Sequence, residues 1–254
     1  MRLEGKVALV TGGASGLGRG AAEALIEGGA RAVIVDLNEE VGEKAVADMG
    51  DGARYVAADV TDPTQVQKAV DTAVAQFGAL HIAVNCAGIA WAQRTVDRSG
   101  PHDLDIFTKV VTVNTIGTFN VARLAAAKML ENEPEDGERG VIINTASIAA
   151  FDGQIGQVAY AASKGGVVGM TLPIARDLAS QMVRCNTIAP GTMNTPMLAL
   201  LPEETKQALA AGIPHPRRLG EPSEFGALVR HLVENAYING ETIRLDGALR
   251  MPPK

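Results

Sequence analysis

Short apolar runs alternate with longer stretches of helical periodicity along most of the chain. The runs are rich in Val, Ile, Leu and Ala, as expected for strands that are buried on both faces. Strands that alternate with helices are typical of a parallel sheet covered by helices on both sides. The predicted strands lie at 6–11, 32–36, 53–57, 81–85, 141–145, 183–189 and 241–245. The pattern therefore predicts an α/β protein with a doubly wound, seven-stranded parallel sheet.

The longest break in this alternation lies between residues 191 and 218. Several prolines flank or interrupt it, and it contains a short amphipathic stretch at 203–211. It follows the sixth predicted strand, and so lies at the edge where such sheets bind ligands. A structural loop and a mobile substrate lid both fit this segment, and its length and position favour the lid. No domain linker or repeat is visible, so we expect one domain over 1–254 with a lid at about 191–218.

A glycine-rich turn follows the first predicted strand. The apolar run leads into a helical stretch through Thr11-Gly12-Gly13-Ala14-Ser15-Gly16-Leu17-Gly18. Glycines at this spacing allow a tight turn, a close approach of pyrophosphate to the backbone, and a helix N-terminus that binds the anion. Asp36 ends the second predicted strand and follows the last glycine of the turn, Gly18, by nearly the spacing of about 20 residues at which a carboxylate meets the adenosine ribose. Asp36 could also be a turn residue, but the turn and the carboxylate together predict a dinucleotide site.

A tyrosine and a lysine lie four positions apart in a later helical stretch, at Tyr160 and Lys164. On a helix this spacing places both side chains on one face. Ser147 lies upstream, just after the apolar run 141–145. A phenol has an ordinary pKa of about 10, and an adjacent ammonium lowers that pKa toward neutrality. A surface tyrosine and a solvated lysine also fit the spacing, but beside a dinucleotide site the three residues predict acid/base chemistry.

Taken together, these motifs resemble the short-chain dehydrogenase/reductase family, and the resemblance covers nearly the whole chain. The order continues with Asp59-Val60 after the third predicted strand, Asn85-Cys86-Ala87-Gly88 after the fourth, Asn114 in a long helix, and Pro190-Gly191. Cys86 departs from the family's usual N-N-A-G sequence, which matters little if that position contacts the cofactor through its backbone. The resemblance implies a single-domain Rossmann fold and a nicotinamide cofactor.

Longer segments resemble one subgroup of that family, the type 2 3-hydroxyacyl-CoA dehydrogenases, also called type 10 17β-hydroxysteroid dehydrogenases. The matching segments are 117–121, 139–147, 165–178 and 243–248, together with the polar insertion 131–138 before the fifth predicted strand. By composition alone, the insertion would be a solvated loop. The segment 181–186 departs from many relatives, which carry a glycine-containing turn there and a β-branched residue in place of Cys185, but it lies away from the expected chemistry.

The resemblance implies NAD as the cofactor. Asp36 would accept hydrogen bonds from a free ribose 2′-hydroxyl and repel a 2′-phosphate, and neither Leu37 nor Ser15 offsets that charge. NAD is therefore expected in preference to NADP. The residues that match cofactor contacts are Gly12, Ser15, Gly16, Leu17, Gly18, Asp36, Asp59, Val60, Cys86, Tyr160, Lys164, Met193 and Thr195.

The resemblance also implies a catalytic set of Asn114, Ser147, Tyr160 and Lys164. Tyr160 would take the proton of the substrate hydroxyl, and Ser147 would orient the substrate oxygen. Lys164 would hold the nicotinamide ribose and, with the positive nicotinamide ring, lower the pKa of Tyr160. Asn114 would keep a water that links Lys164 to solvent. A structural asparagine inside a helix is the alternative for Asn114. The expected substrate contacts are Ser147, Gln154 and Tyr160, and Gln154 either reaches the acyl group or is exposed.

The subgroup resemblance implies oxidation of a short-chain or branched 3-hydroxyacyl-CoA to the 3-ketoacyl-CoA. The lid offers apolar residues that suit an acyl chain, and Arg217 and Arg218 either contact the coenzyme A phosphates or face solvent. The apolar lid residues are Met193, Met197, Leu198, Leu200 and Leu201. The same catalytic apparatus would serve a steroid or another secondary alcohol, which is the alternative substrate class. A nucleotide-binding scaffold without activity would not need the intact catalytic set.

Composition argues against several other classes of protein. The net charge of −6 disfavours a general nucleic-acid surface, so no nucleic-acid-processing role is expected. The two cysteines, Cys86 and Cys185, and the four histidines lack the spacing of a disulfide framework or a metal site, so we expect buried thiols and no metal. No apolar run approaches the ~20 residues that cross a bilayer, and no signal segment is visible. We therefore expect a cytoplasmic protein without a membrane partner.

Residues 236–245, which include the last predicted strand, are apolar for the edge of a sheet. Such an edge promotes association unless it is covered. The family resemblance implies symmetric pairing into a homotetramer that acts on a small-molecule acyl-CoA, alcohol or ketone.

Overall fold

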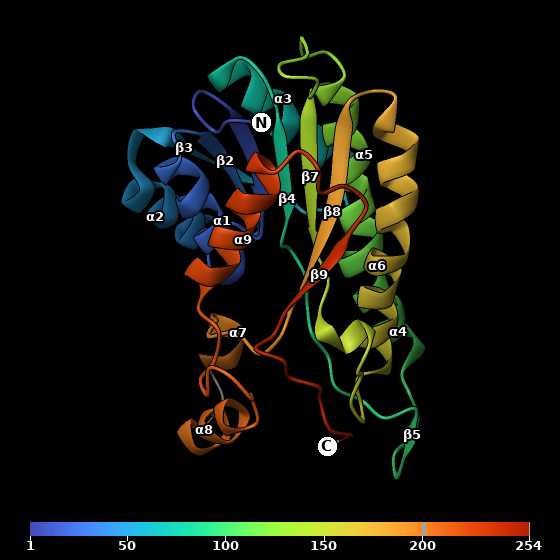
Figure 1. Ribbon diagram of the computed structural model, residues 1–254. Coiled ribbons are helices and arrows are strands. Elements are labelled where there is room, and N and C mark those ends of the chain that lie inside the picture. The colour runs from blue at the N-terminus through green and yellow to red at the C-terminus, as the bar shows by residue number, and fades with distance from the viewer. Residues whose placement is uncertain (200–201, 254) are drawn as a thin grey trace.

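A parallel sheet of seven strands forms the centre of the protein (Figure 1). The computed structural model describes residues 1–199 and 202–253. The strand order is β3-β2-β1-β4-β7-β8-β9, and neighbouring strands in this sheet are parallel. The strands are β1 Val7–Thr11, β2 Arg31–Asp36, β3 Ala53–Ala57, β4 Ile82–Asn85, β7 Gly140–Thr145, β8 Val183–Pro190 and β9 Thr242–Leu245. All seven predicted strands are confirmed, each within one residue of its predicted bounds.

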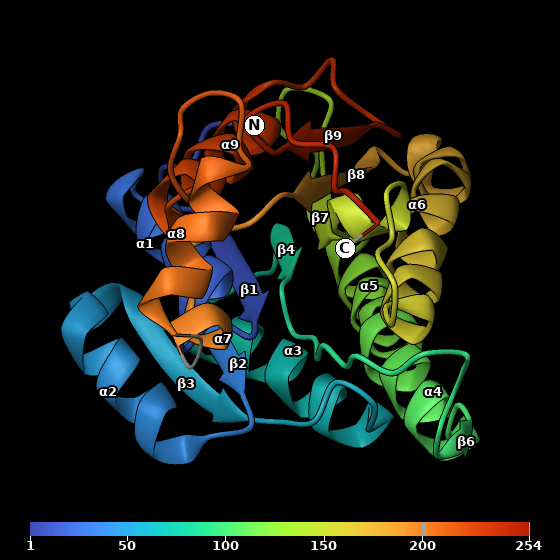
Figure 2. The same ribbon diagram turned by 90° about the horizontal axis from the view of Figure 1, so that it is seen from below.

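Helices cover both faces of the sheet (Figure 2). One face carries α1 Gly16–Glu27, α2 Glu39–Met49 and α9 Pro222–Glu234. The other face carries α3 Pro63–Phe77, α4 Leu104–Val111, α5 Thr118–Met129 and α6 Val158–Ala179. Helices α1 and α9 pack backbone to backbone, because a Cβ on Gly226 would lie only 2.3 Å from the carbonyl oxygen of Gly20. The predicted doubly wound arrangement is confirmed.

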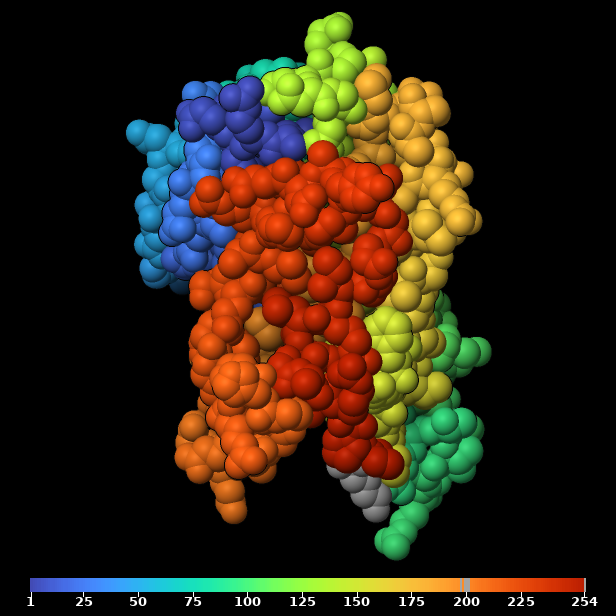
Figure 3. Space-filling model, viewed as in Figure 1, coloured from blue at the N-terminus to red at the C-terminus, as the bar shows by residue number. Residues whose placement is uncertain are grey.

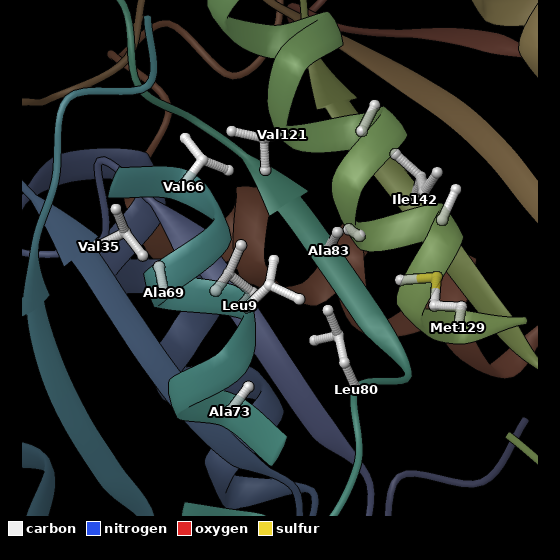
Figure 4. Close-up of a cluster of buried hydrophobic side chains, with 14 of the residues drawn as sticks. Leu9, Val35, Val66, Ala69, Ala73, Leu80, Ala83, Val121, Met129 and Ile142 are labelled. Atoms are coloured by element: carbon white, nitrogen blue, oxygen red, sulfur yellow. The ribbon is translucent and has the colours of Figure 1, made fainter. Parts of the chain in front are cut away.

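The strands bury alternate side chains in two separate cores. Leu9 of β1 packs with Val66 of α3 and Val121 of α5 on one face, as Figure 4 shows. The next residue, Val10, belongs to the core on the other face, together with Phe225 of α9. Full burial of each such aliphatic or aromatic side chain contributes roughly 1.5–3 kcal/mol. These two cores hold the strand ends, and therefore the residues that follow each strand, in fixed positions.

The two ends of the lid segment, residues 191–218, lie close together beyond the end of β8. Met193 and Gly220 form a parallel bridge, and the nitrogen of Asn194 donates to the carbonyl of Gly220 at 2.7 Å. The segment contains two short helices, α7 Pro196–Ala199 and α8 Glu203–Ala211, and α8 matches the predicted amphipathic stretch. Figure 3 shows an indentation between the α7–α8 region, in orange, and the C-terminal segment, residues 246–253, in red. Both border the carboxyl ends of the strands (Figure 1).

Two local features differ from the sequence-based expectation. A small antiparallel hairpin, β5 Val96–Asp97 and β6 Gly100–Pro101, follows β4. The insertion 131–138 is not wholly a solvated loop, because the carboxylate of Glu138 is buried and forms an ion pair with Arg184 of β8. Burial of a carboxylate requires a partner of opposite charge, and Arg184 supplies it. The insertion lies at the amino end of the sheet, opposite the lid segment (Figure 1).

Candidate active site

The glycine turn lies where β1 passes into α1. Gly12 has a φ of 62°, and a Cβ there would lie 2.9 Å from the backbone nitrogen of Ala87. A Cβ on Gly18 would lie 2.2 Å from the carbonyl oxygen of Gly12. Side chains are therefore excluded at both positions, which lets α1 begin directly against the turn. The free N–H groups at the start of α1 form the kind of site that binds a pyrophosphate.

Asp36 ends β2 beside this turn. Its Oδ2 accepts a hydrogen bond from the nitrogen of Ala14 at 3.2 Å, and its Oδ1 accepts one from the nitrogen of Leu37 at 2.8 Å. The hydroxyl of Tyr55 donates to the carbonyl of Asp36 at 3.0 Å, which fixes the strand end. The carboxylate is thereby held against the turn, where a dinucleotide places its adenosine ribose. The turn and Asp36 together fit a dinucleotide cofactor.

Two further expected cofactor contacts meet the turn from other elements. A Cβ on Gly16 would lie 3.4 Å from the side chain of Thr195, so the start of the lid segment lies against the turn. The nitrogen of Cys86 donates to Oγ1 of Thr11 at 3.2 Å, which brings the end of β4 to the same place. The side chain of Met193 packs into the core, so a cofactor contact at that position would come from its backbone.

Asp59 and Val60 lie in the loop after β3. Oδ1 of Asp59 accepts a hydrogen bond from Oγ1 of Thr61 at 2.8 Å, and the carbonyl of Val60 accepts one from Nδ2 of Asn120 at 2.9 Å. Ser15 directly precedes α1, and Leu17 lies in its first turn. All of these expected contacts follow the carboxyl ends of strands β1 and β3. Their contact with the cofactor stays a prediction.

Helix α6 carries both Tyr160 and Lys164. Lys164 is buried, and its Nζ donates to the carbonyl oxygen of Thr145 at 2.8 Å. The same Nζ lies 5.9 Å from the centroid of the Tyr160 ring, so the two side chains share one side of the helix as predicted. Burial lowers the pKa of Lys164 to about 8, and the nearby Cys86 opposes that shift. The site therefore holds a lysine that loses its proton more easily than usual.

Tyr160 lies in a buried environment, and burial raises the pKa of its phenol above the ordinary value. The expected lowering by Lys164 together with the positive nicotinamide ring stays a prediction. The ammonium of Lys164 is directed to Thr145. Burial disfavours the charged phenolate, and the hydroxyl of Ser147 opposes this rise in the pKa. Ser147 therefore has an electrostatic role at Tyr160 as well as the expected role at the substrate oxygen.

Asn114 lies in a π-helical turn, Thr112–Gly117, between α4 and α5. The expected long helix is therefore interrupted at this residue, as is common at functional sites. Asn114 is completely buried, and its Oδ1 accepts a hydrogen bond from the nitrogen of Ile89 at 2.8 Å. Its Nδ2 donates to the carbonyl of Ile89 and to Oγ of Ser163, both at 2.9 Å. Asn114 thereby joins the segment after β4 to the helix that carries Tyr160.

The loop between Ser147 and Tyr160 is closed by its own hydrogen bonds. Oγ of Ser147 accepts from the nitrogen of Ala149 at 3.1 Å. The side-chain amide of Gln154 donates to the carbonyl of Pro252 at 3.0 Å, in the C-terminal segment 246–253. Gln154 is therefore half-buried and tied to that segment, and its contact with the acyl group stays a prediction.

Both cysteines are free thiols. Cys185 is buried as expected, but Cys86 is partly exposed because it directly follows the end of β4 at the site. Burial raises the pKa of Cys86 to about 11 and that of Cys185 to about 12. Within residues 1–199 and 202–253, no cluster of three or more His, Cys, Asp or Glu is placed to hold a metal ion. In the same ranges no helix combines the length and apolar character needed to cross a membrane.

Two residues of the site were not singled out by sequence reasoning. Ser163 receives the hydrogen bond of Asn114 and itself donates to the carbonyl of Tyr160 at 2.8 Å. Thr145 offers its carbonyl to Lys164 and its hydroxyl to Cys86. The available signal for Ser163 was a small polar residue directly before Lys164 in an otherwise apolar helix. Thr145 gave no signal, because its role depends mainly on a backbone carbonyl.

The site is that of an α/β oxidoreductase built around a dinucleotide turn and a Tyr–Lys pair. The chain belongs to the short-chain dehydrogenase family, which it matches over residues 6–206. It is 55% identical over 254 residues to 3-hydroxyacyl-CoA dehydrogenase type-2 of Drosophila melanogaster, covering 99% of this chain and 100% of the relative. The protein of that name from Homo sapiens is 53% identical, with 99% of this chain and 97% of the relative covered.

A solved structure gives the same result. The crystal structure of 3-hydroxyacyl-CoA dehydrogenase type-2 from Mycobacterium avium superposes with a TM-score of 0.95 at 47% identity, covering 98% of each chain. The family and subgroup resemblances stated from the sequence motifs are both confirmed by these matches.

Proposed function

We propose that this chain is an NAD-dependent dehydrogenase that oxidises a short-chain or branched 3-hydroxyacyl-CoA to the 3-ketoacyl-CoA. The observation that carries the proposal is how the helix that bears Tyr160 and Lys164 is held. Lys164 donates to the carbonyl of Thr145, two residues before Ser147, and Asn114 is linked to the carbonyl of Tyr160 through the hydroxyl of Ser163. The names of the full-length relatives support the choice of substrate.

The cofactor is NAD, which accepts a hydride from the substrate carbon when bound. The glycine turn and the start of α1 would hold its pyrophosphate, and Asp36 would hold its adenosine ribose. Asp59 and Val60 would lie near the adenine, and Ser15, Leu17, Cys86, Met193 and Thr195 would complete the contacts. Lys164 would bind the nicotinamide ribose. Its ammonium lies near the Tyr160 ring, so the ribose would be held next to the catalytic phenol.

The residues of the chain handle the proton. Tyr160 takes the proton of the substrate hydroxyl as general base, and Ser147 orients the substrate oxygen by donating a hydrogen bond to it. Lys164 passes the proton onward toward solvent through a water kept near Asn114. Asn114 and Lys164 both lie against Gly88, since a Cβ there would lie 3.0 Å from Oδ1 of Asn114 and 3.5 Å from Nζ of Lys164.

The lid segment would cover the acyl chain. Its two ends are held together near Gly220, and Ile213 packs against Leu249 of the C-terminal segment. Leu198 is a half-buried candidate for the apolar lining. Leu200 and Leu201 lie outside the described residues, as does the side chain of Met197. Gln154 would contact the substrate together with Ser147 and Tyr160.

The two arginines proposed for coenzyme A differ in their surroundings. Arg218 forms a two-pronged ion pair with Glu224, with nitrogen–oxygen distances of 2.7 and 2.8 Å. Because this pair occupies both terminal nitrogens, Arg218 is a poor candidate for a phosphate contact. Arg217 remains the better candidate of the two.

We infer that the protein forms a homotetramer in the cytoplasm. Tyr237, next to the edge strand β9, is fully exposed, and Ile116 and Phe119 are exposed around the start of α5. Exposed aromatic and aliphatic side chains on an edge and on a helix face are typical of surfaces that pair. The free thiols Cys86 and Cys185 are consistent with a reducing compartment. Light scattering tests the assembly, and a monomer mass at micromolar concentration would contradict it.

The direct test of the proposed activity is the reverse reaction. Acetoacetyl-CoA and NADH are mixed with the protein, and the loss of NADH absorbance is followed. The proposal predicts turnover by the wild-type chain, with NADPH far less effective than NADH. Failure to oxidise NADH with any 3-ketoacyl-CoA would refute it.

A further inference from the structure

Arg244 lies in β9, the last strand of the sheet, and its guanidinium joins three groups. Nη2 lies 2.5 Å from Oδ2 of Asp152, Nε lies 2.7 Å from Oδ2 of Asp246, and Nη2 also donates to the carbonyl of Leu249 at 3.0 Å. Cζ of Arg244 lies 5.3 Å from the centre of the Phe151 ring. One side chain therefore connects the last strand, the C-terminal segment and the loop that contains Asp152.

That loop joins Ser147 to Tyr160. A 3₁₀ turn, Ile148–Ala150, follows Ser147 directly, and the nitrogen of Asp152 donates to the carbonyl of Ile148 at 2.9 Å. Only four residues separate Ser147 from Asp152, and hydrogen bonds within the turn hold them in place. A shift of Asp152 would therefore displace the hydroxyl of Ser147, which acts on both the substrate oxygen and Tyr160.

The C-terminal segment is packed against the same loop and against the lid segment. Leu249 forms a small buried cluster with Ile148 of the loop and Ile213 of the lid segment. The nitrogen of Ile155 donates to the carbonyl of Pro253 at 3.0 Å. The C-terminal segment therefore forms one side of the indentation seen in Figure 3 and packs against both the Ser147–Tyr160 loop and the lid segment.

We propose that Arg244 is a positioning residue for the active site: it clamps the Ser147–Tyr160 loop to the C-terminal segment, and so keeps the hydroxyl of Ser147 aligned with the substrate oxygen. The inference rests on the proposed function, because it assigns Arg244 to the dehydrogenase site. Arg244 touches neither the substrate oxygen nor the reacting atoms, and acts through Asp152.

The ion pair between Arg244 and Asp152 is more buried than an ordinary surface pair. Exposed pairs contribute little, but the side chains of Arg244 and Asp152 are only 20% and 21% exposed. The fork of Arg244 also binds Asp246, which is 7% exposed and packs against Gly191 at the start of the lid segment. The planar guanidinium thus fixes the relative positions of two carboxylates on two different segments.

The test compares Asp152→Asn with wild type in three measurements. These are kcat with acetoacetyl-CoA, KM for NADH, and backbone hydrogen exchange of residues 148–157. We expect kcat to fall roughly 10-fold or more, because a displacement of about 1 Å at a reacting group reduces the rate strongly. KM for NADH should stay within about twofold, since the cofactor residues lie elsewhere, and exchange should rise in 148–157.

Two further variants complete the comparison. Asp152→Glu keeps the charge and should restore most of kcat. Arg250→Gln is the matched control, because Arg250 also binds Asp246 but is 60% exposed and has no contact with Asp152 among its hydrogen bonds. It should leave kcat and exchange in 148–157 at the wild-type level.

Unchanged kcat in Asp152→Asn would overturn the inference. A lower kcat together with a higher KM for NADH and faster exchange throughout the chain would also overturn it, because this pattern indicates general destabilisation. If wild type does not reduce acetoacetyl-CoA, the proposed function fails on that result alone. The exchange comparison needs no substrate, and it would then decide whether Arg244 clamps the loop.

Discussion

Nζ of Lys164 lies 2.8 Å from the carbonyl oxygen of Thr145, and this hydrogen bond joins helix α6 to the end of strand β7. Ser147 follows two residues after Thr145, and Tyr160 lies one helical turn before Lys164. The single contact therefore fixes the separation between the hydroxyl that orients the substrate and the phenol that takes its proton. Burial and this contact give Lys164 a structural role in addition to its expected role at the cofactor.

Tyr160→Phe should abolish turnover while leaving NAD binding nearly intact. The substitution removes only the proton acceptor and keeps the ring packed in α6. General base catalysis is typically worth ~10²–10⁴-fold, and a larger loss is expected where no other base can substitute. Steady-state kinetics and a fluorescence titration with NADH measure the two effects. Turnover within a few-fold of wild type would exclude Tyr160 as the base.

Ser147→Ala should shift the pH dependence of oxidation to higher pH. Burial raises the pKa of Tyr160, and the hydroxyl of Ser147 opposes that rise. Without this hydroxyl the pKa rises further, so the deprotonated phenol, which is the active base in oxidation, forms only at higher pH. A profile of kcat against pH measures the shift. Ser180→Ala, an exposed serine at the end of α6, is the control and should leave the profile unchanged.

Asp36→Ala should narrow the preference for NAD over NADP. The carboxylate of Asp36 is held against the glycine turn by Ala14, where it would repel a 2′-phosphate. Removal of that charge should raise kcat/KM for NADP and lower it for NAD. Equal kcat/KM for the two cofactors in the wild-type protein would show that Asp36 does not set the preference.

Asn114→Ala should reduce both stability and turnover. The change leaves the N–H and the carbonyl of Ile89 without a partner, at about 1–3 kcal/mol for each. Ser163 loses the hydrogen bond that it accepts from Asn114 but still donates to the carbonyl of Tyr160. Urea unfolding measures the loss. Asn132→Ala is the matched control, because the amide of Asn132 also donates two hydrogen bonds, here to backbone carbonyls, but belongs to the insertion before β7. It should lower stability and leave kcat unchanged, so an equal kcat in both variants would assign Asn114 to structure alone.

The fold was predictable because its strands have a simple signal. β1 and β7, for example, are buried along their whole length and each contains an apolar run, at 7–10 and 141–143, which polar residues end. Asp36 and the glycine turn were predictable for a related reason. They lie at fixed distances from strand ends, so sequence spacing translates into a position at the carboxyl edge of the sheet.

Other parts of the site depend on tertiary contacts that no local pattern records. The π-helical turn at Asn114 uses residues that also form an ordinary helix, so periodicity gave one long helix. Arg244 and Asp152 are 92 positions apart, and each alone reads as a surface charge. The raised pKa of Tyr160 follows from burial, which the spacing to Lys164 does not reveal. The β5–β6 hairpin was missed because its strands are only two residues long.

The central claim is the substrate, and a panel of ketones tests it most directly. Acetoacetyl-CoA, its 2-methyl analogue, longer 3-ketoacyl-CoAs and 17-ketosteroids are each assayed for NADH oxidation by the wild-type protein. An apolar pocket discriminates by only about 1–3 kcal/mol per methylene, so neighbouring chain lengths should overlap in rate. We predict the highest kcat/KM for a short or branched 3-ketoacyl-CoA. A higher kcat/KM for the steroids than for every thioester would contradict the claim and make the protein a steroid dehydrogenase.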